Sequence, residues 1–223
     1  MGNICRRAIL EIAKALVGGI INKIPIQQKI VQKLSEILSV CRCVIFKLSN
    51  NEACDAYDIE LTAGIPLEEH IDDIGRKETV QKHPDIEEAV RRGKIMVITD
   101  PRNSPLTAYF RQIIEQKGTT QILYLPLISE LGGKTIGVIV LDAVGEKLGF
   151  ESEEIEFCGE VGELISLIID REEILAEEIR DLVINRMTAL GGFAARLGKD
   201  ARVVMDEVEK IEKICSKGGR INF

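Results

Sequence analysis

Two apolar stretches joined by a glycine-containing turn constrain the fold of this chain more than any other feature. Residues 121–128 and 135–142 are rich in leucine, isoleucine and valine, and Leu131-Gly132-Gly133 lies between them. This combination is typical of two strands joined by a hairpin. Because a short turn joins strands that run in opposite directions, the sequence predicts a sheet with antiparallel neighbours.

Further elements between residues 41 and 142 extend this sheet. Three more strands are predicted, at residues 41–48, 54–63 and 95–99. Helical segments are predicted between the strands, at residues 85–92 and 106–116. Five strands with helices before, between and after them predict an α+β fold, in which an antiparallel sheet has helices on its faces.

Amphipathic helices are predicted towards both ends of the chain. Residues 3–22 keep apolar side chains at steps of three and four, and Pro25 suits the first turn of a second helix that continues to Leu38. Near the other end, Ser152 is a predicted N-cap for a helix whose apolar stripe continues to Leu197. Another helix at residues 200–215 would fold back on it as an antiparallel hairpin.

The long C-terminal stripe predicts self-association. It is longer than the α+β core can cover, and uncovered it would be a large exposed apolar patch. We therefore expect a parallel homodimer held by residues 155–197, with help from residues 3–22. These long N- and C-terminal amphipathic helices would form a dimeric bundle.

The composition argues against several classes of partner. The formal net charge is −7, only 4% of the residues are aromatic and tryptophan is missing, so a nucleic-acid partner is not expected. The most apolar window, residues 9–26, is interrupted by Glu11, Lys14 and Lys23, so membrane insertion is not expected either. These features predict a cytoplasmic protein.

Cysteine and histidine offer little chemistry in the sequence. The six cysteines form no C-x-x-C pair and are expected to be reduced thiols, most of them buried. Cys41 and Cys43 are predicted to lie on one face of a strand, and a packed apolar face is a simpler role for them than redox or metal chemistry. The only histidines, His70 and His83, have no partner at ligand spacing, so no metal site is predicted.

The middle of the chain resembles a GAF domain. The resemblance rests on the helix-then-strand run LSEILSVCRCVIFKL, the turn AGIPLEE and the helix–strand run AVRRGKIMVITDP. The strands in LYLPLISELGGKTIGVIVLD and the helix in FESEEIEFCGEVGELISLI complete it, so that it covers residues 25–170. The resemblance implies a small-molecule pocket on one face of the sheet, under a lid between the third and fourth strands.

The lid corresponds to the segment from Asp100 to Gln121. Its side chains are able to hydrogen-bond a polar or anionic ligand. The candidate ligand-binding residues are Arg102, Asn103, Tyr109, Arg111, Thr119 and Gln121. Bilin-binding GAF domains and GAF-type free methionine sulfoxide reductases use cysteines in this part of the domain, but this chain has none between Asp55 and Phe157. The cyclic-nucleotide pattern is also missing, so the cofactor or ligand stays unidentified.

Residues 185–197, NRMTALGGFAARL, resemble the first helix of the dimerisation and phosphotransfer domain of sensor histidine kinases. That family's pattern is H-E-[IL]-R-N-P-[LM]-T, of which Asn185, Met187 and Thr188 match. Arg186 replaces the proline, and Asp181 stands where the phospho-accepting histidine belongs. An aspartate cannot form the phosphoramidate that this chemistry requires, and no ATP-binding domain is recognised. The resemblance therefore implies a degenerate hairpin without catalytic residues.

These inferences predict four parts: an N-terminal helix at residues 1–24, a GAF domain at 25–170, a signalling helix with the degenerate hairpin at 171–216, and a tail at 217–223. The leading hypothesis is a two-component-type sensor that relays the state of a small-molecule ligand through a dimeric bundle. Its expected partner is a histidine kinase or a response regulator. Two enzyme hypotheses stay open: a sensor histidine kinase truncated before its ATP-binding domain, and a GAF-based redox enzyme.

Overall fold

The computed structural model describes residues 26–51, 56–145 and 147–171 of the 223-residue chain. The predicted helix at residues 3–22, Asp181 and the predicted hairpin lie outside these residues, as does most of the predicted dimer seam. The chain divides into two compact units, and the fold set out here is that of the first, residues 1–167.

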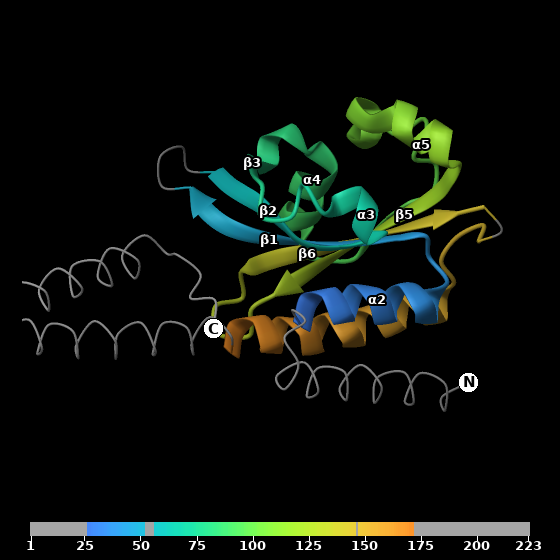
Figure 1. Cartoon of the computed structure of the whole chain (residues 1–223). Coiled ribbons are helices and arrows are strands. Elements are labelled where there is room, and N and C mark those ends of the chain that lie inside the picture. Colours follow the sequence, from blue (N-terminus) through green and yellow to red (C-terminus); the bar gives the residue numbers. More distant parts are fainter. Residues whose placement is uncertain (1–25, 52–55, 146, 172–223) are drawn as a thin grey trace, which may run out of the picture. The chain divides into compact units, whose positions relative to one another are not determined.

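A six-stranded antiparallel sheet forms the centre of this unit (Figure 1). The strand order is β3-β2-β1-β6-β5-β4, and every neighbouring pair is antiparallel. The strands are β1 (Arg42–Asn51), β2 (Ala56–Ile65), β3 (Lys77–Thr79), β4 (Met96–Ile98), β5 (Thr119–Ile128) and β6 (Thr135–Val144). The predicted antiparallel sheet and the β5–β6 hairpin are confirmed. The prediction of five strands is wrong, because β3 is a three-residue edge strand that has no apolar alternation.

Helices lie on both faces of the sheet (Figure 1). One face carries α2 (Ile26–Leu38) and the closing helix, which begins at residue 152. The other face carries α3 (Leu67–His70), the 3-10 turn η1 (Val80–Lys82), α4 (Pro84–Arg92), the 3-10 segment η2 (Pro105–Phe110) and α5 (Arg111–Lys117). The α+β fold is thus confirmed for the described part of the chain.

Local sequence explains the faces and ends of these helices. In α2 the apolar residues Ile30, Leu34 and Leu38 recur at steps of four and are all buried, because they share one side of the helix. α4 starts with Pro84 in its first turn, where a missing N–H costs nothing. It ends at Gly93, whose φ of 58° is the left-handed conformation that glycine adopts without strain.

The closing helix is capped one residue earlier than predicted. Its first helical residue is Ser152, so the cap is Glu151. The backbone N–H groups of Glu154 and Ile155 donate to the carbonyl of Glu151 at 3.0 Å each. The Glu154 side chain reaches back to the backbone N–H of Glu151 at 3.0 Å, which is the reciprocal contact of a capping box.

The sheet has an apolar core on each side. Towards the closing helix, Leu125 packs so closely on Gly162 that a Cβ there would lie 2.9 Å from its Cδ1 atom. On the other side, buried residues of the strands and of α4 and α5 form one cluster that includes Ile59, Ile122 and Tyr124. The candidate site lies beside this second cluster, over β1 and β2.

The described cysteines are free thiols. Cys43 and Cys158 are buried, and burial raises the pKa of both, that of Cys158 to about 12. Such cysteines carry no reactive thiolate at neutral pH. Cys41 is exposed and precedes β1, so the prediction that it shares a strand face with Cys43 is wrong. Among the described segments, no helix has the length and apolar character that a membrane crossing requires.

Candidate functional site

The floor of the candidate site is the face of β1 and β2 that carries α3, α4 and α5. Alternate residues of a strand share a face, so apolar side chains from both strands gather there. They are Val44, Phe46, Ile59 and Leu61.

A β-bulge at Thr62 shapes one end of this floor. The register pairs Phe46 with Leu61 but Val44 with Gly64, so β2 contains one residue more than β1 over this stretch. The Thr62 hydroxyl donates to a backbone carbonyl of β1 at 3.2 Å. An extra residue reverses the alternation that follows it, so Gly64 returns to the same face as Leu61.

Gly64 leaves room for the imidazole of His70, the last residue of α3. A Cβ at position 64 would lie 2.7 Å from Cδ2 of His70, so any side chain there would displace the ring. The backbone of Gly64 is also bound by Gln28 of α2, which donates to its carbonyl at 2.9 Å and accepts from its N–H at 3.2 Å. The backbone of one glycine therefore links His70 to α2.

A cavity of about 330 Å³ lies over the floor. Its other lining residues come from β1, from α3 and the segment between α3 and α4, and from α5: Arg42, His70, Asp73, Arg76, Glu78, His83 and Ile113. An apolar cavity with a few convergent polar groups is the usual form of a small-molecule site, and this volume is at the lower end of the range for such sites.

Arg42 carries a firmly anchored positive charge in the cavity wall. It faces Asp142 across the β1–β6 pair, with its Nη1 3.1 Å and 3.2 Å from the two carboxylate oxygens. The Asp142 side chain is 7% exposed and that of Arg42 25%. Burial opposes the charge on Arg42, but the Asp142 carboxylate outweighs it by attraction and hydrogen bonding, so the pKa of Arg42 is raised.

His70 contributes a buried nitrogen without a partner to the same wall. Its Nε2 makes no hydrogen bond within the residues that the structure describes. Burial lowers the pKa of His70, and the charge of Arg42 lowers it further, so the ring is neutral near pH 7. An unpaired buried polar atom costs about 1–3 kcal/mol, so this position favours a ligand that can reach it.

The rim of the cavity carries charges of both signs. Arg76, whose side chain is 65% exposed, lies 2.9 Å from Glu78 and 3.3 Å from Asp73. Because two carboxylates already bind this guanidinium, its charge and its N–H donors are less available to a ligand than those of Arg42.

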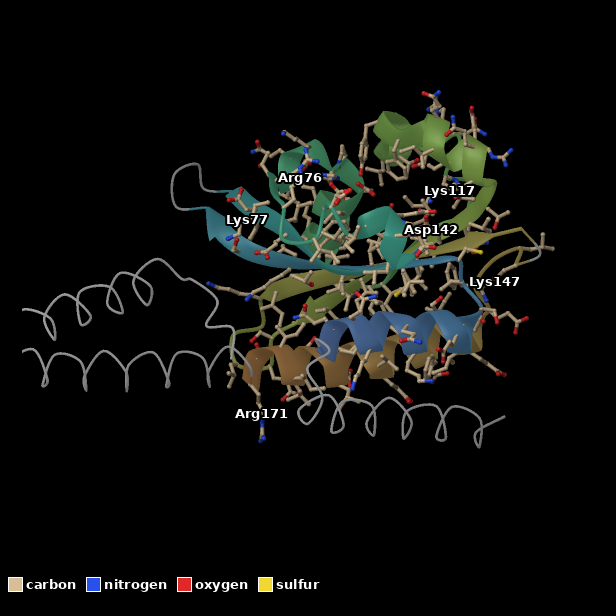
Figure 2. The ribbon with its side chains drawn as sticks, in the orientation of Figure 1. Arg76, Lys77, Lys117, Asp142, Lys147 and Arg171 are labelled. Atoms are coloured by element: carbon tan, nitrogen blue, oxygen red, sulfur yellow. The ribbon has the colours of Figure 1, made fainter. Side chains whose placement is uncertain are left out.

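An exposed ion pair joins the two helices on either side of the cavity. Lys117 of α5 pairs with Glu69 of α3, next to His70. Figure 2 shows Lys117 and Arg76 on the side of the sheet that carries these helices. Exposed pairs contribute about 0–1 kcal/mol, so this pair adds little to the hold of α5 on α3.

A chain of hydrogen bonds connects the cavity rim to the second core. Asp85, which is 3% exposed, accepts from the hydroxyls of Tyr124 at 2.6 Å and Tyr109 at 2.8 Å. The hydroxyl of Tyr109 lies 3.1 Å from Nδ1 of His83, and Nε2 of His83 lies 3.1 Å from a carboxylate oxygen of Glu78. The chain thus runs from β5 through α4 and η2 to β3.

The hydrogen-bonding groups of this chain determine where its protons lie. Tyr109 gives its one hydroxyl hydrogen to Asp85, so its oxygen accepts from the Nδ1–H of His83. The hydrogen bond from His83 lowers the pKa of Glu78, and an ionised carboxylate can only accept. The His83 ring thus links the Tyr109 hydroxyl to the Glu78 carboxylate.

We expect Tyr109 and Tyr124 to resist ionisation at alkaline pH. Burial, and after it the Asp85 carboxylate, raises the pKa of both far above its usual value. An unfolded chain loses tyrosine protons near pH 10, about the ordinary pKa. Above that pH the folded state binds more protons than the unfolded state, so the free energy of unfolding should fall as the pH rises. Urea unfolding below and above pH 10 tests this; a stability that does not change would contradict it.

Three of the six predicted lid residues make defined contacts. Tyr109 reaches the cavity through its hydrogen bond to His83. Asn103 lines a second, more open pocket along β4. The Oε1 atom of Gln121 accepts from the backbone N–H of Phe150, just before the closing helix, at 3.0 Å.

The other three candidates lie apart from the cavity. Arg102 and Arg111 are exposed, and Thr119 is buried. In the described part of the chain, none of the six candidates lines the cavity, and the lid contributes Ile113 instead. Binding by these six residues stays a prediction.

Sequence reasoning does not identify Arg42, His70 or His83 as site residues. The sequence did contain one signal for Arg42. It occupies alternate positions of one strand with Val44 and Phe46, so the three side chains must share a face. The packing of His70 on Gly64 depends on the β-bulge at Thr62, which no local sequence pattern predicts. Within the described ranges, no three His, Cys, Asp or Glu side chains lie together in a way that could hold a metal ion.

The sequence matches the GAF domain family over residues 23–169. Comparison with the curated proteins finds no match. Among solved structures, the GAF domain of a phosphoenolpyruvate-protein phosphotransferase from Coxiella burnetii has a TM-score of 0.59 and 19% identity, over 77% of this chain and 94% of that chain. The blue-light absorbing form of the PixJ GAF domain from Thermosynechococcus elongatus has a TM-score of 0.52 and 20% identity, over 70% and 89%. The phytochrome photosensory core module of Stigmatella aurantiaca has a TM-score of 0.55 and 14% identity, over 91% and 44%.

The identities are low, so these structures support the fold alone. The family match is broader evidence, because it spans well over half of the chain and includes every described strand and the cavity. The chain therefore belongs to the GAF domain family.

Proposed function

We propose that this chain is a sensory module whose cavity over β1 and β2 binds a small molecule. The observation that carries the proposal is the cavity wall, in which a permanently charged Arg42 and an unpartnered nitrogen of His70 stand above an apolar floor. Two of the similar structures, the PixJ GAF domain and the phytochrome module, are by their names light-absorbing or photosensory. They support sensing as the role of this fold, without indicating what this chain senses.

Two contacts connect the sheet to the helices on its opposite face, and the first of them begins at the cavity lining. His70 packs on Gly64, whose backbone is bound by Gln28 of α2. On β5, Gln121 binds the backbone of Phe150, just before the closing helix. A ligand can shift this arrangement only if it binds one position of these helices more tightly than another.

The sequence extends the proposal beyond the described residues. We propose that the cytoplasmic chain forms a parallel homodimer, and that its helical bundle passes the ligand state to a histidine kinase or response regulator without phosphotransfer. The lid residues Arg102, Asn103, Tyr109, Arg111, Thr119 and Gln121 remain candidates for closing over the ligand. Arg111 lies two residues before Ile113, which already lines the cavity.

A thermal-shift screen of metabolites on the full chain tests the proposal. A ligand present at about a hundred times its Kd should stabilise the chain by about 2.7 kcal/mol. If the ligand is anionic and the lid closes on it, Arg111→Ala should weaken binding by about 1.5–3 kcal/mol, the usual worth of a hydrogen bond to a charged group. The matched control is Arg91→Ala, an exposed arginine of α4 outside the cavity lining. Failure of every metabolite to stabilise the chain would count against a sensory cavity.

A further inference from the structure

Positive and negative side chains are nearly balanced in the cavity lining. Its hydrogen-bond donors differ, however, in whether they already bind an acceptor of the protein. Arg76 is bound by two carboxylates, and the two ring nitrogens of His83 lie 3.1 Å from Tyr109 and Glu78. Arg42 binds Asp142 through Nη1, and its Nη2 and Nε make no hydrogen bond to any residue in the described ranges. The uncommitted donors of the lining are therefore on Arg42 and, beside it, on His70.

We propose that Arg42 and His70 form an anion subsite, and that the ligand is a small carboxylic acid with an apolar body. The proposal rests on the sensory function proposed above and specifies the ligand of that cavity. Nη2–H and Nε–H of an arginine form a planar fork that matches the two oxygens of a carboxylate. The apolar body would lie on Val44, Phe46 and Leu61, with Ile113 over it.

A single negative charge suits this wall better than a phosphate does. Arg42 is already partly neutralised by Asp142, and Asp73 and Glu78 line the same cavity. A dianion would meet these carboxylates without a second uncommitted cation. The small volume, about 330 Å³, also favours a compact ligand.

This anion subsite predicts that binding of a carboxylate is coupled to protonation of His70. The charged groups near His70 are Arg42 of β1, Lys117 of α5, Glu69 of α3 and Asp73 in the turn that follows α3. Burial and Arg42 keep the free ring neutral by lowering its pKa. A carboxylate between Arg42 and His70 offsets the repulsion from Arg42 and favours the imidazolium. Binding should therefore take up a proton, and affinity should rise as the pH falls towards the ordinary histidine pKa of about 6.5.

Isothermal titration of the full chain with matched probes tests the proposal. The probes are benzoate and hexanoate, their neutral counterparts benzamide and hexanamide, and inorganic phosphate. We expect the carboxylates to bind at least tenfold more tightly than the amides, and phosphate to bind more weakly than either carboxylate. Titrations in two buffers of different ionisation enthalpy should reveal proton uptake with the carboxylates.

Variants separate the subsite from the rest of the cavity. His70→Phe keeps a ring over Gly64 but removes both nitrogens, so it should abolish proton uptake and weaken carboxylate binding at least tenfold, with little effect on the amides. Arg42→Met alone would leave Asp142 buried without its partner, so it is combined with Asp142→Asn. This double variant should also lose the preference for carboxylates, whereas Arg91→Ala should keep it.

The outcomes distinguish this proposal from the proposed function. Amides that bind as tightly as the acids, or tighter phosphate binding, would overturn the carboxylate subsite and leave a ligand-binding cavity in place. Carboxylate binding that is unchanged in both the His70 and Arg42 variants would also overturn it. Absence of carboxylate binding overturns the subsite too, and the metabolite screen then decides separately whether the cavity binds any ligand.

Discussion

Replacing Asp85 with alanine should lower the free energy of unfolding by about 2–5 kcal/mol. Asp85 is buried and accepts from the hydroxyls of Tyr109 and Tyr124. Its removal leaves the buried hydroxyl of Tyr124 without an acceptor, at about 1–3 kcal/mol, and takes from the half-exposed Tyr109 a hydrogen bond to a charged group, which contributes about 1.5–3 kcal/mol. Losses of this size are expected where a buried hydrogen-bond network is broken.

Urea unfolding of the full chain measures this loss. The matched control is Asp72→Ala, because Asp72 is exposed in the turn after α3 and its replacement should change stability by about 0.5 kcal/mol or less. Equal stability of the Asp85 and Asp72 variants would show that the hydrogen-bond chain between β5 and the cavity rim does not stabilise the fold.

Replacing Leu61 with phenylalanine should weaken ligand binding at least tenfold, about 1.4 kcal/mol. Leu61 lies on the floor, and the larger ring would occupy cavity space that the ligand needs. Leu61 belongs to the second core cluster but also borders the cavity, which can take up the larger ring, so the stability should change by less than about 1.5 kcal/mol.

The control for this variant is the same substitution on the other face of the sheet. Leu127 is fully buried there and does not line the cavity. Leu127→Phe should destabilise the chain by about 1–3 kcal/mol through overpacking, while the affinity per folded molecule is unchanged. Titration calorimetry and urea unfolding of both variants separate the two effects. Unchanged affinity in Leu61→Phe would place the ligand outside the cavity.

The sheet could be predicted because its signals are local. The hairpin of β5 and β6 has two apolar strands around a glycine turn, and α4 has a proline at its start and a glycine at its end. β3 gives no such signal, since Lys77, Glu78 and Thr79 form a strand only by pairing with the edge of β2. Its pairing is a consequence of the tertiary fold.

The site was harder to predict because it depends on contacts between distant residues. The order of strands and helices correctly predicts a sheet with helices on its faces, and the lid that the resemblance to GAF domains implies does contribute Ile113. Arg42 and His70 lie 28 positions apart in the sequence, as their numbers show. Both line the cavity, and the His70 ring has room there because the bulge at Thr62 turns Gly64 towards it. A one-residue change of register would remove that space.

The most direct test of the ligand-binding cavity uses the two histidines of the chain. His70 and His83 are the only histidines in the sequence, and both line the cavity. The imidazole proton NMR signals therefore report on this site alone. During titration with a ligand that stabilises the chain, both signals should shift with one common dissociation constant, and Leu61→Phe should raise that constant at least tenfold. A ligand that raises Tm while both imidazole signals stay unmoved would contradict the account.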